Sequence, residues 1–266
     1  MRKLRLSIAL ITISLVFSLA AAASDYVPDV ETIVKKANLA AYYAGQDGRA
    51  TIKMTITDAQ KRTREREFTI LRLDQEDGER QKFYVYFRKP SDVKGMVFMV
   101  HKYLEKDDDR WLYLPALDLV KRIAASDKRT SFVGSDFFYE DVSGRALDED
   151  THQLIDTTET HYVIENRPKD PKSVEFKSYI VWIDKKTFLP VKAEYNDREG
   201  QLYRRVKALK IEELKGYPTV VESQVENLAS GGFTISCFSR IDYDINLKES
   251  LFTERYLRRP PRAAKR

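Results

Sequence analysis

Most of the chain alternates between apolar and polar residues with a period of two, which is typical of half-buried β-strands. The alternation starts near Ala50 and recurs in separate runs as far as Ile241. Turn-forming residues separate these runs, for example Asn196–Gly200, Lys215-Gly216 and Ser230–Gly232. The pattern therefore predicts about ten or eleven antiparallel strands joined by hairpins.

Helical spacing occurs at both ends of this strand-rich region. Apolar residues from Val30 to Ala41 follow Pro28 at helical spacing, and Gly45 and Gly48 can end that helix. A second helix is predicted over residues 248–257. No linker or shift in composition divides the strand-rich region, so residues 24–257 are expected to form a single domain.

Three predicted strands are apolar on both faces: Met96–Val100, Trp111–Leu114 and Tyr179–Ile183. In an antiparallel sheet this indicates that both faces are covered. The second face could be covered by the N-terminal helix, by the long loop after Pro115, or by a ligand. Periodicity alone favours complete filling of that space by the helix and the loop, with a ligand as the alternative.

The first 23 residues have the pattern of a secretory signal peptide. A basic start at Arg2, Lys3 and Arg5 precedes an apolar stretch and the small residues 20–23. Cleavage after Ala23 would leave no N-terminal cysteine for lipid attachment. The remainder is expected to be an exported, unanchored periplasmic protein.

The signal peptide and the C-terminal tail carry the chain's positive charge. The formal net charge is +5, but three basic residues lie in the signal peptide and five lie in residues 258–266. Residues 24–257 therefore carry a net charge of −3 by the same count. This excludes a basic domain of the nucleic-acid-binding kind. The tail is interpreted as a disordered, solvated end, with contact to anionic lipid or to a partner as the alternative.

The residues that usually perform catalysis or bind metals are sparse. The three histidines, His101, His152 and His161, belong to no metal-ligand or catalytic motif. Cys237 alternates with Phe233 and Ile235 and is expected to be a buried, inert thiol. The acidic runs 107–109 and 148–150 lack the spacing of a calcium loop and are interpreted as solvated turns.

A long aromatic connection separates the two strand-rich halves. Residues 115–141 carry Phe132, Phe137, Phe138 and Tyr139 beside a Gly-Ser-Asp turn. Long loops with their own aromatic cluster tend to be lids or binding loops, although such a loop could also close one end of a barrel.

The segments Arg110–Leu117, Lys121–Ile123, Ser131–Asp141 and Leu251–Leu257 resemble the outer-membrane lipoprotein-sorting (LolA-like) family, in the branch found with inner-membrane RND-type exporters. The resemblance covers roughly residues 33–257. It implies a mainly β fold with a helical lid, in which a strongly curved antiparallel sheet forms an incomplete barrel. It also implies transport of a lipid or lipidated cargo, with no catalytic residue and no cofactor.

From the residues and the resemblance together, we expect a monomeric periplasmic carrier without bound metal or nucleic acid. It would accept a lipid or lipidated protein from an RND-type exporter and pass it towards the outer membrane. The alternative is a sensor or adaptor that binds the exported domain of a membrane protein; an enzyme using Asp136 with Arg110 or His101 is a third interpretation. The expected contacts to cargo or lid are Trp111, Tyr113, Phe132, Phe137, Phe138, Met96, Phe98 and Trp182.

Overall fold

The computed structural model describes residues 27–75 and 80–265, so the predicted signal peptide lies outside the described residues. The strands form one antiparallel sheet in the order β6-β5-β4-β3-β2-β1-β13-β12-β11-β10-β9-β8-β7. Their bounds are β1 Asp47–Thr57, β2 Thr63–Asp74, β3 Gln81–Lys89, β4 Val97–Lys102, β5 Asp109–Leu114, β6 Leu119–Arg122, β7 Asp150–Thr157, β8 His161–Pro168, β9 Phe176–Asp184, β10 Pro190–Asp197, β11 Leu202–Leu214, β12 Tyr217–Asn227 and β13 Gly232–Tyr243.

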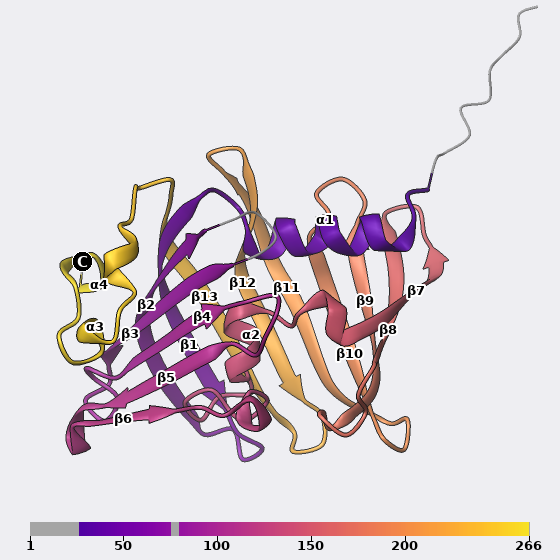
Figure 1. Cartoon of the computed structure of the whole chain (residues 1–266). Helices are drawn as coiled ribbons and strands as arrows, with labels where there is room; N and C mark the ends of the chain where they lie inside the picture. The colour runs from indigo at the N-terminus through magenta and orange to yellow at the C-terminus, as the bar shows by residue number, and fades with distance from the viewer. Residues whose placement is uncertain (1–26, 76–79, 266) are drawn as a thin grey trace, which may run out of the picture.

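The sheet curls strongly around a concave face and remains open between its edge strands β6 and β7 (Figure 1). The predicted incomplete antiparallel barrel is therefore confirmed. The described residues contain thirteen strands, where the sequence predicted ten or eleven. The four-residue edge strand β6 lies in the region that had been interpreted as loop.

In residues 27–75 and 80–265, four α-helices accompany the sheet: α1 (Val30–Tyr42), α2 (Tyr139–Ser143), α3 (Arg255–Arg258) and α4 (Arg262–Lys265). Helix α1 lies along one rim, above the strands on the β7 side, and α2 lies in front of the concave face (Figure 1). The first helix occurs where the sequence predicted it, with Asp29 accepting the Thr32 amide as its N-cap. None of the helices in the described ranges has both the length and the apolar composition needed to cross a membrane.

Strands β4 and β5 are buried on both faces, as their sequences predicted. On the concave side, Phe98 and Leu112 pack beneath the long connection after β6. On the convex side, Met99 and Trp111 pack against the end of the chain, where Phe252 is fully buried. The C-terminal segment, and not a ligand, therefore covers the second face of these strands.

The C-terminal segment differs from its prediction. Residues 248–257 form a 3-10 turn (Glu249–Leu251) and the four-residue α3 in place of one helix. In a continuous helix Phe252 and Leu257 would point about 140° apart, whereas here both enter the same cluster. Residues 258–265, predicted as a disordered tail, continue along the sheet, and Ala264 is fully buried.

Strand β13 presents the face opposite to the one predicted. Its inward residues Thr234 and Ser236 lie beside Ile56 and Met54 of β1, and both are buried. Cys237 points outward and is exposed, so the expectation of a buried thiol was wrong. The alternation misled because the small polar residues Thr234 and Ser236 face the interior, while Phe233 and Ile235 alternate with them on the other face.

Candidate functional site

A cavity of about 520 Å³ lies on the concave face beneath α1. This volume is within the range of about 300–1,000 Å³ that is typical of ligand pockets. Small and apolar side chains form much of its wall. They come from α1 and from both halves of the sheet, and include Ala37, Ala41, Ile52, Met54, Phe68, Ile70, Ile164, Val181, Ile183, Val191, Ala193, Val206, Ala208, Ser223, Ser236 and Phe238.

Helix α1 covers one side of this cavity. Its buried residues Ile33 and Val34 pack against Ile164 and Ile183 of the sheet. At its C-terminal end, Arg72 of β2 donates to the carbonyl oxygens of residues 42, 44 and 45, the last at 2.6 Å. A cation at this end also interacts favourably with the helix dipole. The helix is therefore anchored firmly at the end nearer β2.

A second cover comes from residues 123–149, which we call the lid. Phe132 is almost fully buried, and its ring lies 5.6 Å from that of Phe98 and 5.5 Å from that of Tyr139. Phe137 lines the cavity together with Phe132. Over strands β2–β5 the lid thus packs against the sheet, and the open space lies towards β8–β12.

The end of α2 fits closely against the end of α1. A Cβ atom on Gly144 would lie 2.7 Å from the Tyr42 ring, and Gly144 has φ +75°, so a side chain here meets both a clash and backbone strain. Lys102 donates to the carbonyl oxygen of Ser143 at 2.8 Å. Burial lowers the pKa of the Lys102 ammonium. The Gly144–Tyr42 approach brings the two covers of the cavity together, and the Lys102 hydrogen bond attaches α2 to β4.

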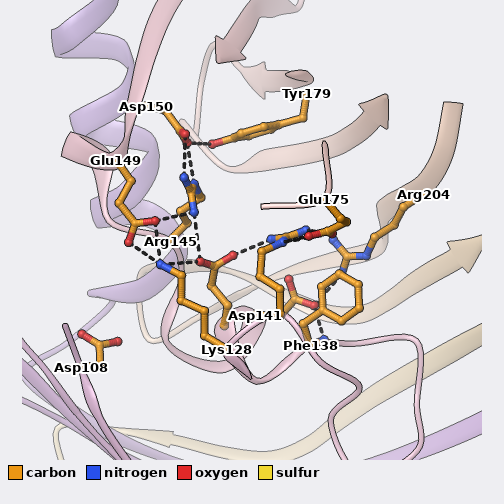
Figure 2. A network of polar contacts seen from close by, with 12 residues as sticks. Asp108, Lys128, Phe138, Asp141, Arg145, Glu149, Asp150, Glu175, Tyr179 and Arg204 are labelled. Carbon is orange, nitrogen blue, oxygen red and sulfur yellow. Dashed lines mark hydrogen bonds and ion pairs between the residues drawn. The ribbon is translucent and has the colours of Figure 1, made fainter. Parts of the chain in front are cut away.

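A network of ion pairs ties the lid to the sheet (Figure 2). At its centre, Glu140 of α2 accepts from Arg129 at 2.5 Å and lies 3.3 Å from both Lys128 and Arg145. Only 3% of the Glu140 residue surface is exposed. Burial alone would raise the pKa of its carboxyl group, but the three surrounding cations outweigh this effect and lower the pKa to about 2.

The network reaches three points outside α2. Arg129 pairs with Glu175, next to β9, at 2.8 Å. Arg145 pairs with Asp150 of β7 at 2.9 Å, and Asp150 also accepts from the Tyr179 hydroxyl at 2.7 Å. The lid is therefore attached to β7 and to β9, on the cavity side of the sheet.

A separate pair connects the lid to β11. Arg204, which is 2% exposed, donates to Asp141 at 2.5 Å. Its guanidinium lies 4.4 Å from the centre of the Phe138 ring, and the same carboxylate accepts the Phe138 amide at 2.7 Å. Phe138 is thus a lid contact between arginines, while its neighbour Phe137 faces the cavity.

The structure places the eight predicted contact residues in five environments. Phe132 and Phe137 line the cavity, and Phe138 lies between lid arginines. Phe98 and Met96 belong to the packed cluster beneath the lid. The remaining three lie elsewhere: Trp111 and Tyr113 pack under the C-terminal segment, and Trp182 lies under Lys192 on the convex face.

Residues considered for catalysis lie apart or are occupied structurally. Asp136 accepts from Thr234, Arg110 pairs with Asp108, and His101 contacts the carbonyl oxygen of Phe252. The acidic runs are not free solvated turns, because Asp108 and Asp150 are both held in ion pairs with arginine. Among the described residues, no group of three or more His, Cys, Asp or Glu side chains could hold a metal ion.

Proteins that are similar in sequence and structure show which family the chain belongs to. A family model described as an uncharacterized protein family matches residues 79–259, about two thirds of the chain. A DUF1329 family protein from Desulfovibrio piger is 29% identical, with a TM-score of 0.77, and the match covers 85% of this chain and 96% of that one. A Vibrio parahaemolyticus domain named for outer membrane lipoprotein sorting is also 29% identical, with a TM-score of 0.77 and coverage of 86% and 98%.

The chain belongs to the family that this model describes. A LolA superfamily protein from Nitrosomonas europaea shares the fold, with 18% identity, a TM-score of 0.66 and coverage of 86% of this chain and 100% of that one. No curated protein matches the sequence.

In this LolA-like chain, sequence reasoning missed most of the cavity wall. Ala193, Ala208 and Ser223 line the cavity from strands that looked ordinary. The available signal was side-chain size, because several neighbouring strands place small residues on the same face and so leave volume unfilled. Most of the aromatic residues predicted as cargo contacts are instead packed against other parts of the protein.

Proposed function

We propose that this LolA-like protein is a carrier that shelters the acyl chain of a lipid or lipidated protein in the concave cavity. It would accept its cargo from an inner-membrane RND-type exporter and release it towards the outer membrane. The observation that carries the proposal is the apolar cavity of about 520 Å³ between α1 and strands β8–β13.

Physical chemistry explains why such a cavity suits transport without catalysis. Each exposed methylene costs about 0.8 kcal/mol, so a sixteen-carbon chain in water costs ~12 kcal/mol. A cavity that removes this surface from water lets the cargo cross an aqueous compartment. Release then requires movement of the covers, and no bond needs to be made or broken. A non-enzymatic role is part of the proposal.

The location and organisation of the chain follow as further parts of the proposal. Residues 1–23 would be a cleaved signal peptide that directs a single carrier domain, residues 24–257, to the periplasm as a monomer. Crosslinking in cells tests the route: a carrier should be captured with components of both membranes. A sensor or adaptor would be captured with one dominant partner, and this outcome would overturn the transport route.

Filling the cavity tests the cargo site directly. Ala193 of β10 lines the cavity, so Ala193→Trp should occupy its volume. We expect native mass spectrometry of the gently purified protein to detect bound lipid in the wild type and at least tenfold less in the variant. Binding of a fluorescent fatty acid should weaken by a similar factor.

A tryptophan on the opposite face provides the matched control. Ile180 lies on the neighbouring strand β9, opposite Glu194, and is half-buried outside the cavity. Ile180→Trp should keep wild-type lipid binding. Lipid-free wild-type preparations, or equal binding by Ala193→Trp, would contradict the carrier function.

A further inference from the structure

The C-terminal segment has two chemically different sides. Residues 248–265, which we call the C-terminal cap, lie beside strands β2–β5 (Figure 1). Phe252, Leu257 and Ala264 face the sheet and are fully buried. The opposite side carries the exposed residues Arg255, Arg258, Arg259, Arg262 and Lys265.

The charge of the cap is strongly unbalanced. It contains six basic and two acidic residues. One of the two acids, Glu249, is occupied by Lys82 at 2.5 Å and by Gln75 at 2.8 Å. Within the described part of the chain, Arg259 and Arg262 form no ion pair. The fold therefore concentrates uncompensated cations on one outer surface.

Two exposed leucines lie next to these cations. The turn between β5 and β6 carries Leu117, which is 69% exposed, and Leu119 at the start of β6 is 46% exposed. Between them, Asp118 accepts from Arg258 of the cap at 2.9 Å. This contact joins the leucine turn and the cap into a continuous surface.

We propose that this surface docks on an anionic lipid membrane, with the leucines entering the interfacial region and the cap arginines binding headgroup phosphates. An apolar tip beside a basic cluster is the combination that interfacial attachment requires. Arginine also suits phosphate, because its planar fork donates two parallel hydrogen bonds. The inference goes beyond cargo binding, because none of these residues lines the cavity.

Two kinds of substitution separate the contributions. Leu117→Ser with Leu119→Ser removes the apolar tip, and Arg259→Gln with Arg262→Gln removes two cations that pair with no described residue. Leu209→Ser with Ile211→Ser is the matched control, since these β11 residues are 44% and 40% exposed on another part of the surface. Each protein is mixed with vesicles of phosphatidylethanolamine and phosphatidylglycerol, or of phosphatidylcholine alone, and sedimented.

We expect the wild type and the control to sediment with the anionic vesicles and to remain in solution with phosphatidylcholine. The arginine variant should bind about thirtyfold more weakly, because each interfacial cation contributes about fivefold. The leucine variant should bind at least tenfold more weakly. Added salt should weaken binding of the wild type.

Three results would overturn the proposal: no sedimentation of the wild type with anionic vesicles, undiminished binding by the leucine variant, or equal losses in the control. A wild-type protein that binds an acidic protein but does not sediment with anionic vesicles would count as the first of these results. Urea unfolding midpoints check that the variants remain folded. Native mass spectrometry of the same variants distinguishes a loss of docking from a loss of cargo binding, because the docking variants should retain bound lipid.

Discussion

Glu140 carries more of the lid's attachment than any neighbouring carboxylate, because three cations surround it in a buried setting. Its lowered pKa means that ionised Glu140 favours the folded state. This contribution is fully present above the ordinary pKa of 4.5. It decreases as the pH falls from there through about 2, where the folded-state group also becomes protonated.

Glu140→Gln should therefore lower the free energy of unfolding at pH 7 by about 3 kcal/mol, since it removes the buried carboxylate that three cations share. The difference from the wild type should shrink as the pH falls from 4.5 towards 2. Urea unfolding at several pH values measures it. Glu212→Gln, at an exposed ion pair with Lys210, serves as the control and should unfold like the wild type. A pH-independent difference would contradict the role of the charge.

Cys237 offers a probe of the strand face that the sequence mispredicted. Burial raises the pKa of its thiol, and nearby Glu222 raises it further. Because only the thiolate attacks disulfide reagents, native protein should react completely but slowly at pH 7.5, and faster as the pH rises through 9. Glu222→Gln should accelerate the reaction at pH 7.5. No reaction without denaturant would contradict the exposed position.

At the scale of the elements, periodicity predicted the first helix and the doubly covered strands β4 and β5. Periodicity could not predict which segment covers the convex face of these strands. The covering residues Phe252, Leu257 and Ala264 follow no regular spacing, because the segment that carries them is irregular. The lid network was also beyond reach. Its partners, such as Arg129 and Glu175, lie far apart in sequence and meet only once the sheet has curled.

The junction of α1 and α2 depends on the absence of a side chain at residue 144. Gly144→Ala should cost about 1–3 kcal/mol for the backbone alone, because φ 75° with ψ 154° lies in a region that is essentially restricted to glycine, and more because its Cβ would meet Tyr42. Gly200→Ala isolates the backbone part, since Gly200 has φ +85° and nothing within 4 Å of a new Cβ. Urea unfolding should show a larger loss for Gly144→Ala. Equal losses would contradict the close contact between the two covers.

At the scale of the whole molecule, the sheet is divided into a packed part and a hollow part. Strands β4 and β5 are filled on both faces by the lid and the C-terminal cap. Strands β8–β12 contribute one face to the cavity. The fold class could be predicted from sequence, but this division could not, because it depends on which loop covers which part of the curved sheet.

Phe252→Ala should test the packed part. Removing this fully buried ring should lower the free energy of unfolding by about 3–5 kcal/mol. Phe233→Ala, at a half-buried position on β13, is the control and should cost clearly less. Chemical unfolding followed by circular dichroism measures both. Similar small losses would indicate that the cap adds little to the stability of the sheet.

The pairing of β1 with β13 has a consequence for the order of folding. Strands β1–β6 and β7–β13 are each built from neighbouring hairpins, whereas the central pairing joins Thr57 to Phe233 across about two thirds of the chain. Contacts between residues so distant in sequence form slowly. During synthesis the N-terminus emerges first, so the edge of β1 that pairs with β13 would stay unpaired until almost all of the remaining residues had followed. This strand is therefore where a chaperone would protect the newly made protein.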